Sequence, residues 1–328
     1  MVEEKYEMSS FLKELTVHVE EMLDTEINIL RMPDIPQRGI LLDIYSSEKN
    51  TKNTIIFSSQ QVGLIKDYVI ALNSIRLLLK GVAHKNGTYK VLSFDQEMAT
   101  GGMEQIYLDI LKDTTTRALD LEMKKKMMFY IYLLFYETII DLPFDILANM
   151  IIANICPEMR NAQVYYLLKE SMRDMHDLVS YKAVIPNRYF VMHNAMFYAR
   201  DLLLANRMSE YKLNPMINIP ELKKFKNLNM MELMTQRWEK SAWYQTKLVG
   251  DYLYDNLIKM NIPELFSNSN EADYLRMYGQ GTGIINTWIK MLYLQNFYFW
   301  DTPEHQEITQ KNKDNIETIA RNRIFNEE

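Results

Sequence analysis

Histidine, cysteine and carboxylate side chains most often hold a catalytic metal, but their spacing in this chain does not favour a metal site. Cys156 is the single cysteine, which excludes an intrachain disulfide and a zinc site built from cysteines. The histidines are never three or four residues apart, the spacing that two ligands on one helix face require. They are His18, His84, His176, His193 and His305. We therefore expect no metal and no cofactor.

Acid–base chemistry has candidates that would have to meet in the folded chain. His176 lies between Asp174 and Asp177 and can approach His193 in space, although a solvated or hydrogen-bonded histidine is the ordinary alternative. Asp145 follows Asp141 by one helical turn, as paired catalytic carboxylates can, or as the solvated end of an apolar helix does.

Arg188 and His193 have the R-x4-H spacing, which resembles the motif of HEPN-type ribonucleases, where an arginine and a histidine act on RNA phosphate. The residues between them, Tyr189 to Met192, are typical of a core, and Arg188 follows Pro186 where a helix can begin. The alternative is therefore a structural helix.

The segment Gly279-Gln280-Gly281-Thr282-Gly283 precedes a predicted helix, where backbone amides can bind an anion. Gly279, Gly281 and Gly283 would form that loop. No strand precedes it and no Lys-Ser/Thr follows, so neither a dinucleotide site nor a P-loop is predicted. A flexible loop at the start of a helix is the alternative.

Composition limits the class of partner. Asp and Glu number 43 against 37 Lys and Arg, a formal charge of −6, so we expect no nucleic acid. The chain has 23 Met and 21 Tyr, residue types that are common at adaptable protein interfaces as well as in cores. We expect a protein partner whose identity the sequence does not reveal.

Neither a secretion signal nor a membrane span is predicted. The first residues, Met1-Val2-Glu3-Glu4-Lys5, lack a basic region followed by an apolar stretch. The most apolar run, Met127 to Tyr136, is shorter than the ~20 residues that a membrane span needs, and we expect it in a buried helix. These features predict a cytoplasmic protein with no membrane contact.

Hydrophobic periodicity predicts the elements of the N-terminal part. A helix over 9–24 is followed by strands at 26–30, 39–45 and 54–57, two of them in a hairpin. A second helix should run from Val62 to Lys80 and stop at Gly81. A short strand is expected within 89–94, and Gly101-Gly102 should break the chain.

The rest of the chain has helical periodicity almost throughout. Gly and Pro number only 10 and 9, which also favours helix over a chain with many turns. The fold class predicted is α+β, predominantly α, with a small N-terminal sheet and its helices over 1–102 and a helical part over 103–328 packed as one unit with the first. Helices are expected near 103–122, 125–140, 144–155, 161–181, 188–207, 230–259, 283–300 and 304–325.

The order of strands followed by the segment 67–81 resembles the ImmA/IrrE-type zincin-like metallopeptidases. In that family a similar strand order leads into a helix with the motif HExxH, which supplies two zinc ligands and a general base. Matched residue by residue, the histidine positions fall on Leu72 and Arg76, and the glutamate position falls on Asn73. The family's later helix bears a third ligand and is resembled at Ala148-Asn149, where the nearest carboxylate is Asp145.

The resemblance implies a scaffold that has lost its metal. Leu72 has no lone pair, Arg76 is a permanent cation, and Asn73 cannot act as a general base. The function implied is a non-catalytic protein-binding or regulatory module, a pseudoenzyme. The alternative for this segment is an ordinary α+β domain in which Leu72 and Ile75 pack the core.

Two other function classes stay open. One is a hydrolase with an unrecognised site, which would require a pocket where His176, His193 or Asp145 meets other polar groups. The other is a structural subunit of a larger assembly, which would expose a large apolar surface in the isolated chain.

Overall fold

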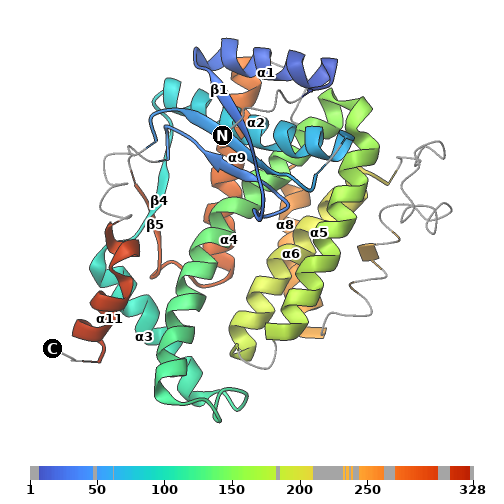
Figure 1. The fold of residues 1–328 in the computed structure, drawn as a ribbon. Coiled ribbons are helices and arrows are strands. Elements are labelled where there is room, and N and C mark those ends of the chain that lie inside the picture. Colours follow the sequence, from blue (N-terminus) through green and yellow to red (C-terminus); the bar gives the residue numbers. More distant parts are fainter. Residues whose placement is uncertain are drawn as a thin grey trace.

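The structure is a computed structural model in which a small sheet and its helices adjoin a larger helical part (Figure 1). It describes residues 7–46, 50–61, 63–181, 185–209, 244–261, 270–301 and 311–325, together with residues 232, 234, 235 and 238. The side chains of 172–181 and of residue 301 are outside the description. The fold is α+β and predominantly helical, as the sequence predicts.

The N-terminal sheet has three strands in the order β1-β3-β2, namely β1 (Ile27–Met32), β2 (Ile40–Leu42) and β3 (Asn53–Ser58). β3 is parallel to β1 and antiparallel to β2, so the predicted hairpin is confirmed. The central strand is the most buried because its Ile55 and Phe57 point into the core.

Helices α1 (Ser10–Leu23) and α2 (Gly63–Lys85) pack on each other, and α2 also packs against β2 and β3. Ser9 caps α1, since its hydroxyl accepts a hydrogen bond from the amide of Leu12. The predicted end of α2 at Gly81 is wrong, because the helix continues to Lys85. Gly81 instead lies against the side chains of Leu23 and Tyr45, where a Cβ would find no room.

The helical part contains one long helix with others along its sides (Figure 1). The elements are α3 (Gln96–Lys112), α4 (Leu121–Ile155), a short 3-10 helix (Pro157–Met159), α5 (Arg160–Tyr181), α6 (Asn187–Arg207), α8 (Tyr244–Lys259), α9 (Glu271–Met291) and α11 (Ile316–Arg323).

Several predicted boundaries differ from those of the structure. The helices predicted at 125–140 and 144–155 are one helix, α4, which continues through the buried Pro143. Gly101-Gly102 does not break the chain but lies within α3. The helix predicted at 283–300 begins at Glu271 and ends at Met291. Of the helix predicted over 230–259, residues 244–259 are helical. Of the helix predicted over 304–325, residues 311–323 are helical almost throughout. Most other residues of these two ranges lie outside the described part of the chain.

A second, two-stranded sheet joins distant parts of the chain. β4 (Val91–Ser93), the short strand predicted within 89–94, pairs antiparallel with β5 (Phe299–Asp301). β5 lies where the sequence predicts helix. Just before β4, the hydroxyl of Tyr278 on α9 accepts a hydrogen bond from the Lys90 amide (3.0 Å) and lies 3.2 Å from its carbonyl oxygen.

The long helix α4 carries the predicted buried run Met127–Tyr136. By length and composition alone α4 could cross a membrane, and 72% of its most apolar 18-residue stretch is buried inside the protein. Buried core helices also have this composition, so the finding gives only weak evidence for a membrane span.

Candidate functional site

One face of α2 carries a row of polar side chains. Asn73, Arg76 and Lys80 follow each other at spacings of three and four, which places them on one side of the helix. Asn73 is buried and its amide nitrogen donates to the carbonyl oxygens of Arg38 (3.0 Å) and Val69 (2.9 Å). Asn73 therefore ties the segment before β2 to α2. Leu72 is likewise buried and belongs to the core.

Arg76 links α2 to α4. Its Nη2 donates to Oδ1 of Asp141 at 2.7 Å, and Oδ2 of the same carboxylate lies 3.6 Å from Nη1 of Arg38. Burial alone would raise the pKa of Asp141, but Arg76 and Arg38 hold this pKa below its ordinary value. Burial opposes the charge of Arg76 too, yet Asp141 and Asp145 keep its pKa above the ordinary value. The pair is therefore ionised at neutral pH.

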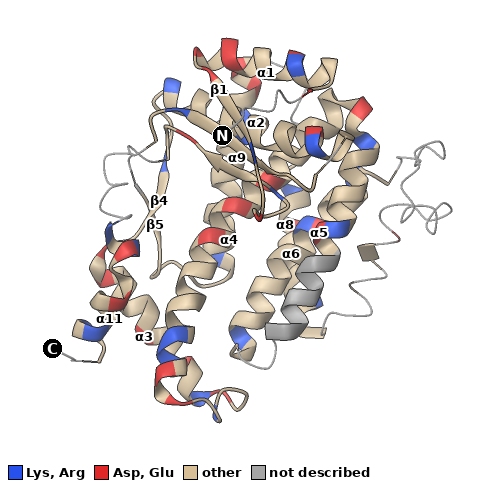
Figure 2. Ribbon diagram, in the orientation of Figure 1, with Lys and Arg blue, Asp and Glu red and all other residues tan. Residues whose placement is uncertain are grey.

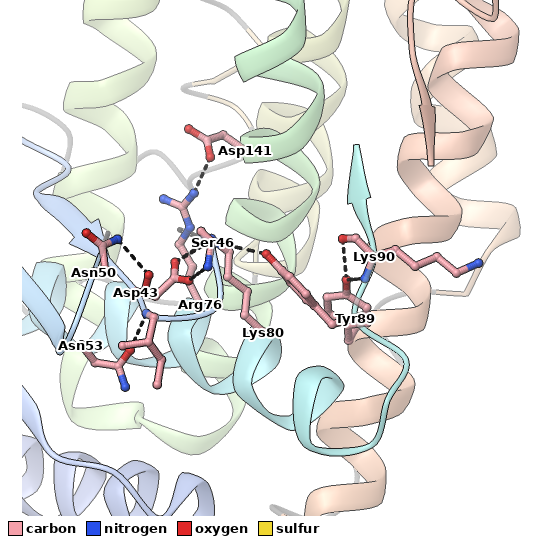
Figure 3. Close-up of polar contacts among 11 residues, drawn as sticks. Asp43, Ser46, Asn50, Asn53, Arg76, Lys80, Tyr89, Lys90 and Asp141 are labelled. Carbon is pink, nitrogen blue, oxygen red and sulfur yellow. Dashed lines mark hydrogen bonds and ion pairs between the residues drawn. The ribbon is translucent and has the colours of Figure 1, made fainter. Parts of the chain in front are cut away.

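Lys80 forms a second buried cluster with the loop after β2 (Figure 3). Its Nζ lies 2.9 Å from both Oδ2 of Asp43 and Oγ of Ser46, and Ser46 donates through both its amide and its hydroxyl to Asp43. A lysine beside a serine can activate a nucleophile when it is neutral. Here burial would lower the pKa of Lys80, but Asp43 and Tyr89 raise it above its ordinary value, so Lys80 remains an ammonium that donates.

A pocket of about 340 Å³ lies between α4 and α6, with contributions from α2, α5 and the segment before β2. Its volume is in the range of small-molecule sites, which begin at ~300 Å³. Its lining combines charged and polar groups with several aromatic side chains. The pocket is lined by Pro36, Arg38, Arg76, Tyr130, Ile131, Leu134, Phe135, Glu137, Thr138, Asp141, Leu142, Asp145, Glu170, Ile185, Tyr189, Phe190, His193, Phe197 and Arg200.

The acidic residues of the pocket come mainly from α4. Glu137, Asp141 and Asp145 are one turn apart in a stretch of this helix that is otherwise uncharged from Met127 onward (Figure 2). The Asp145 side chain is 19% exposed, and its Oδ2 lies 3.8 Å from Nη1 of Arg200, beyond hydrogen-bonding distance. Burial raises the pKa of Asp145 despite the nearby Arg200 and Arg76.

Arg200 is held by the residue next to it. Its Nε and Nη2 donate to Oδ1 of Asp201 at 2.9 and 2.7 Å, and Oδ2 of Asp201 accepts from the Trp238 indole at 2.9 Å. The Arg200 guanidinium also lies over the ring of Phe197, with 5.0 Å between its central carbon and the ring centroid. The aromatic wall of the pocket thus already contacts one cation.

His193 contacts both polar and aromatic side chains of the pocket. Its Nε2 is 3.2 Å from the hydroxyl of Thr138, and its ring packs against Phe135 and Phe197. Burial lowers the pKa of His193 to about 4, so the ring is neutral at pH 7. Among the described residues no carboxylate bonds to this ring, so the triad of nucleophile, base and orienting acid is incomplete there.

The structure brings some predicted residues together and separates others. Arg76, Asp145 and His193 line the same pocket, whereas Leu72 and Asn73 are in the core.

Arg188 does not line the pocket. It pairs with Asp109 of α3 at 3.0 Å, and the Tyr189 hydroxyl donates to the same carboxylate at 2.9 Å. The side chain of His176 lies outside the described residues.

The predicted anion-binding loop is wrong. Gly279, Gly281 and Gly283 lie inside α9, whose first turn is at Glu271, so their amides are committed to the helix. Gly281 is needed for packing, since a Cβ there would contact the ring of Phe144. Closely spaced glycines can mark either a loop or a helix that packs closely against another, and the sequence alone does not distinguish the two.

Arg200, Arg38 and Thr138 were not predicted as site residues. Arg200-Asp201 gives a usable signal, because an adjacent pair of opposite charges within an otherwise apolar stretch of helix, 195–205, indicates a buried ion pair. Among the described residues, no three His, Cys, Asp or Glu side chains are grouped so as to hold a metal ion.

Comparison with known protein families, curated proteins and solved structures finds no match for this chain. The chain is therefore described by its fold class, as a predominantly helical α+β protein whose pocket has both polar and apolar lining residues.

Proposed function

We propose that this protein is a non-catalytic regulatory module, built on a metal-free zincin-like scaffold and acting through a protein partner. The observation that carries the proposal is the ion pair of Arg76 with Asp141. If the family resemblance holds, Arg76 takes a metal-ligand position and places a permanent cation there. A cation held at 2.7 Å from a carboxylate of α4 would repel a metal ion and occupy a carboxylate that could bind one.

The other two matched positions support the loss of catalysis. Asn73 donates both of its described hydrogen bonds to backbone carbonyls and is buried, so neither a substrate nor a water in the pocket reaches it. Leu72 is packed in the core. All three side chains therefore have structural partners in place of catalytic ones.

The arrangement of elements also supports the scaffold proposal. α2 lies against β2 and β3, the neighbours that the resemblance requires. α4 brings Asp141 opposite Arg76 and Asp145 into the same pocket, as the family's later helix brings a ligand to its metal. These contacts are also compatible with an unrelated α+β domain, and restoring the metal ligands separates the two.

Exposed apolar side chains support a protein partner. Tyr244, Leu248 and Tyr252 follow each other at intervals of four on α8, and they are 78%, 59% and 59% exposed. Such a stripe on one helix face is typical of a surface that packs against another protein.

The scaffold proposal is tested by restoring the family's residues. We expect the variant Leu72→His/Asn73→Glu/Arg76→His to bind about one zinc per chain, with a carboxylate of α4 completing the site. The matched control, Leu72→His/Asn73→Glu, keeps Arg76 and should bind none, because the guanidinium repels the ion. Zinc is measured by elemental analysis after dialysis, and circular dichroism verifies folding. A folded triple variant without zinc would contradict the scaffold.

A hydrolase is the second candidate, and the convergence of Asp145 and His193 on one pocket favours it. It predicts turnover of simple esters or amides that is lost in both Asp145→Asn and His193→Gln. Against it, the His193 ring has no orienting carboxylate among the described residues. Wild-type turnover that both substitutions abolish would replace the regulatory proposal with this one.

A further inference from the structure

Some charged side chains of the pocket between α4 and α6 have close partners of opposite charge, and others do not. Two of its arginines, Arg76 and Arg200, each hold a carboxylate at 2.7 Å, Asp141 and Asp201 respectively. These cations are therefore neutralised by partners already in the fold. The Arg38 side chain is 51% exposed and shares Asp141 at 3.6 Å.

Asp145 differs from these residues. Its carboxylate reaches the pocket, receives no hydrogen bond from a described residue, and has its cationic partner at 3.8 Å. Glu170 joins Glu137, Asp141 and Asp145 in the lining, so its four acidic residues outnumber its three arginines in the described wall. A carboxylate in such a place gains more from an incoming cation than a paired arginine gains from an incoming anion.

The aromatic part of the pocket lining fits the rest of such a ligand. Phe135, Tyr189, Phe190 and Phe197 provide an aromatic wall, and Arg200 already lies over the Phe197 ring. Aromatic faces attract ammonium and guanidinium ions and also bury apolar groups. The pocket thus offers a negative group and an aromatic surface within about 340 Å³, enough for a compact organic molecule.

We propose that this pocket binds a small organic ammonium ion, with the ammonium at Asp145 and an apolar body against the aromatic wall. The proposal rests on the proposed function only in treating the pocket as a place of binding without chemistry. Zinc in the restored variants and amine binding in the wild-type chain are separate measurements, so either proposal can fail alone.

The test compares probes that share a phenyl group and differ in charge. Phenethylamine, 2-phenylethanol and 3-phenylpropanoate are titrated into wild-type protein by isothermal titration calorimetry at pH 7.5. We expect phenethylamine to bind about tenfold or more tightly than either of the others, the effect of one added charge contact. This comparison needs no variant and is decisive by itself. Preference for the propanoate, equal affinity for all three, or no binding of phenethylamine overturns the proposal.

A second arm assigns the binding to Asp145. Asp145→Asn keeps the shape of the side chain and removes its charge, so it should weaken phenethylamine binding about tenfold and leave 2-phenylethanol unchanged. Asp255→Asn, at an exposed carboxylate of α8, is the matched control and should change neither affinity. Unchanged phenethylamine binding in folded Asp145→Asn contradicts the assignment.

A third arm separates a free amine from a lysine of a partner protein. Nα-acetyl-lysine-methylamide presents an ammonium on a flexible chain without an aromatic body. We expect it to bind at least about tenfold more weakly than phenethylamine, because it cannot use the aromatic wall. Tighter binding of the lysine derivative would contradict a small aromatic amine as the ligand.

Discussion

The ion pair between Arg76 and Asp141 joins two buried helices, so removing one partner leaves a charge without its counterion. We expect Asp141→Asn to destabilise the protein by about 2–3 kcal/mol, below the full cost of breaking a buried pair because Asp141 is 33% exposed. Urea denaturation measures the change in the free energy of unfolding. Glu137→Gln is a control on the same helix, since Glu137 pairs with Lys313 at the surface and should cost only about 0.5 kcal/mol or less.

The double variant Arg76→Met/Asp141→Asn completes the cycle. With the guanidinium gone, no buried cation is left unpaired, and part of the stability lost in Asp141→Asn should return. The two single variants of the cycle are Arg76→Met and Asp141→Asn. If their losses of unfolding free energy simply add in the double variant, the two residues are not coupled.

The neutral ring of His193 makes stability depend on pH. Burial lowers the pKa of this ring from 6.5 to about 4, so the unfolded chain binds its proton at a higher pH than the folded chain does. The stabilising contribution is therefore complete above pH 6.5 and is lost as the pH falls from about 6.5 towards 4. We expect the free energy of unfolding to fall by about 1–2 kcal/mol between pH 7 and pH 5. The lower part of this range allows for solvent in the pocket that the ring contacts.

His193→Gln tests this dependence. Glutamine carries no titrating group, so the decline in unfolding free energy between pH 7 and pH 5 should be shallower in the variant than in the wild-type protein. Parallel pH profiles for the two proteins would show that His193 is not the group responsible.

At the scale of elements, two glycines in helices give opposite predictions. Gly81 of α2 lies against Leu23, and a Cβ would approach a Leu23 methyl carbon to 2.5 Å. We expect Gly81→Ala to destabilise the protein by about 1–3 kcal/mol, through overpacking between α1 and α2. Gly101 of α3 faces open space, with no neighbouring side chain within 4 Å of where a Cβ would stand. Gly101→Ala should therefore stabilise the protein by about 0.5–1 kcal/mol through helix propensity.

Thermal unfolding of the two alanine variants checks these signs. Both substitutions are the same chemical change in a helix, so a difference between them reports the packing at each site. A Gly81→Ala variant as stable as the wild-type protein would contradict the contact between α1 and α2, and destabilisation by Gly101→Ala would contradict the open surface of α3.

The sequence predicts elements where the local pattern is strong. Helix 9–24, the N-terminal strands and the start of α2 follow from periodicity, since each has one buried face. The sequence does not predict β5, because a strand of three residues is recognised by the strand it pairs with. Phe299–Asp301 pairs with Val91–Ser93 only in the folded chain. The two helices predicted at 125–140 and 144–155 are one helix, because the packing around α4 outweighs the hydrogen bond lost at Pro143.

The candidate site is only partly predictable for the same reason. Arg76, Asp145 and His193 are candidates from sequence, but they lie on three helices and their meeting depends on how these helices pack. Arg38, which helps to fix the charges of the pocket, has no motif that marks it, and Arg200 is indicated only by its neighbour Asp201. Sequence patterns describe one element at a time, whereas the pocket is a property of several.

At the scale of the whole molecule, we propose that the sheet, α2 and α4 form a scaffold in which an arginine replaces a metal ion. The zinc content of the wild-type protein tests this claim most directly. Purified protein is incubated with zinc, dialysed and analysed for metal. We predict no stoichiometric zinc, because Leu72 and Arg76 offer no ligand atoms and Arg76 repels the ion. About one zinc per chain, lost on substituting His193 or His176, would contradict the proposed scaffold and indicate a metalloenzyme with another set of ligands.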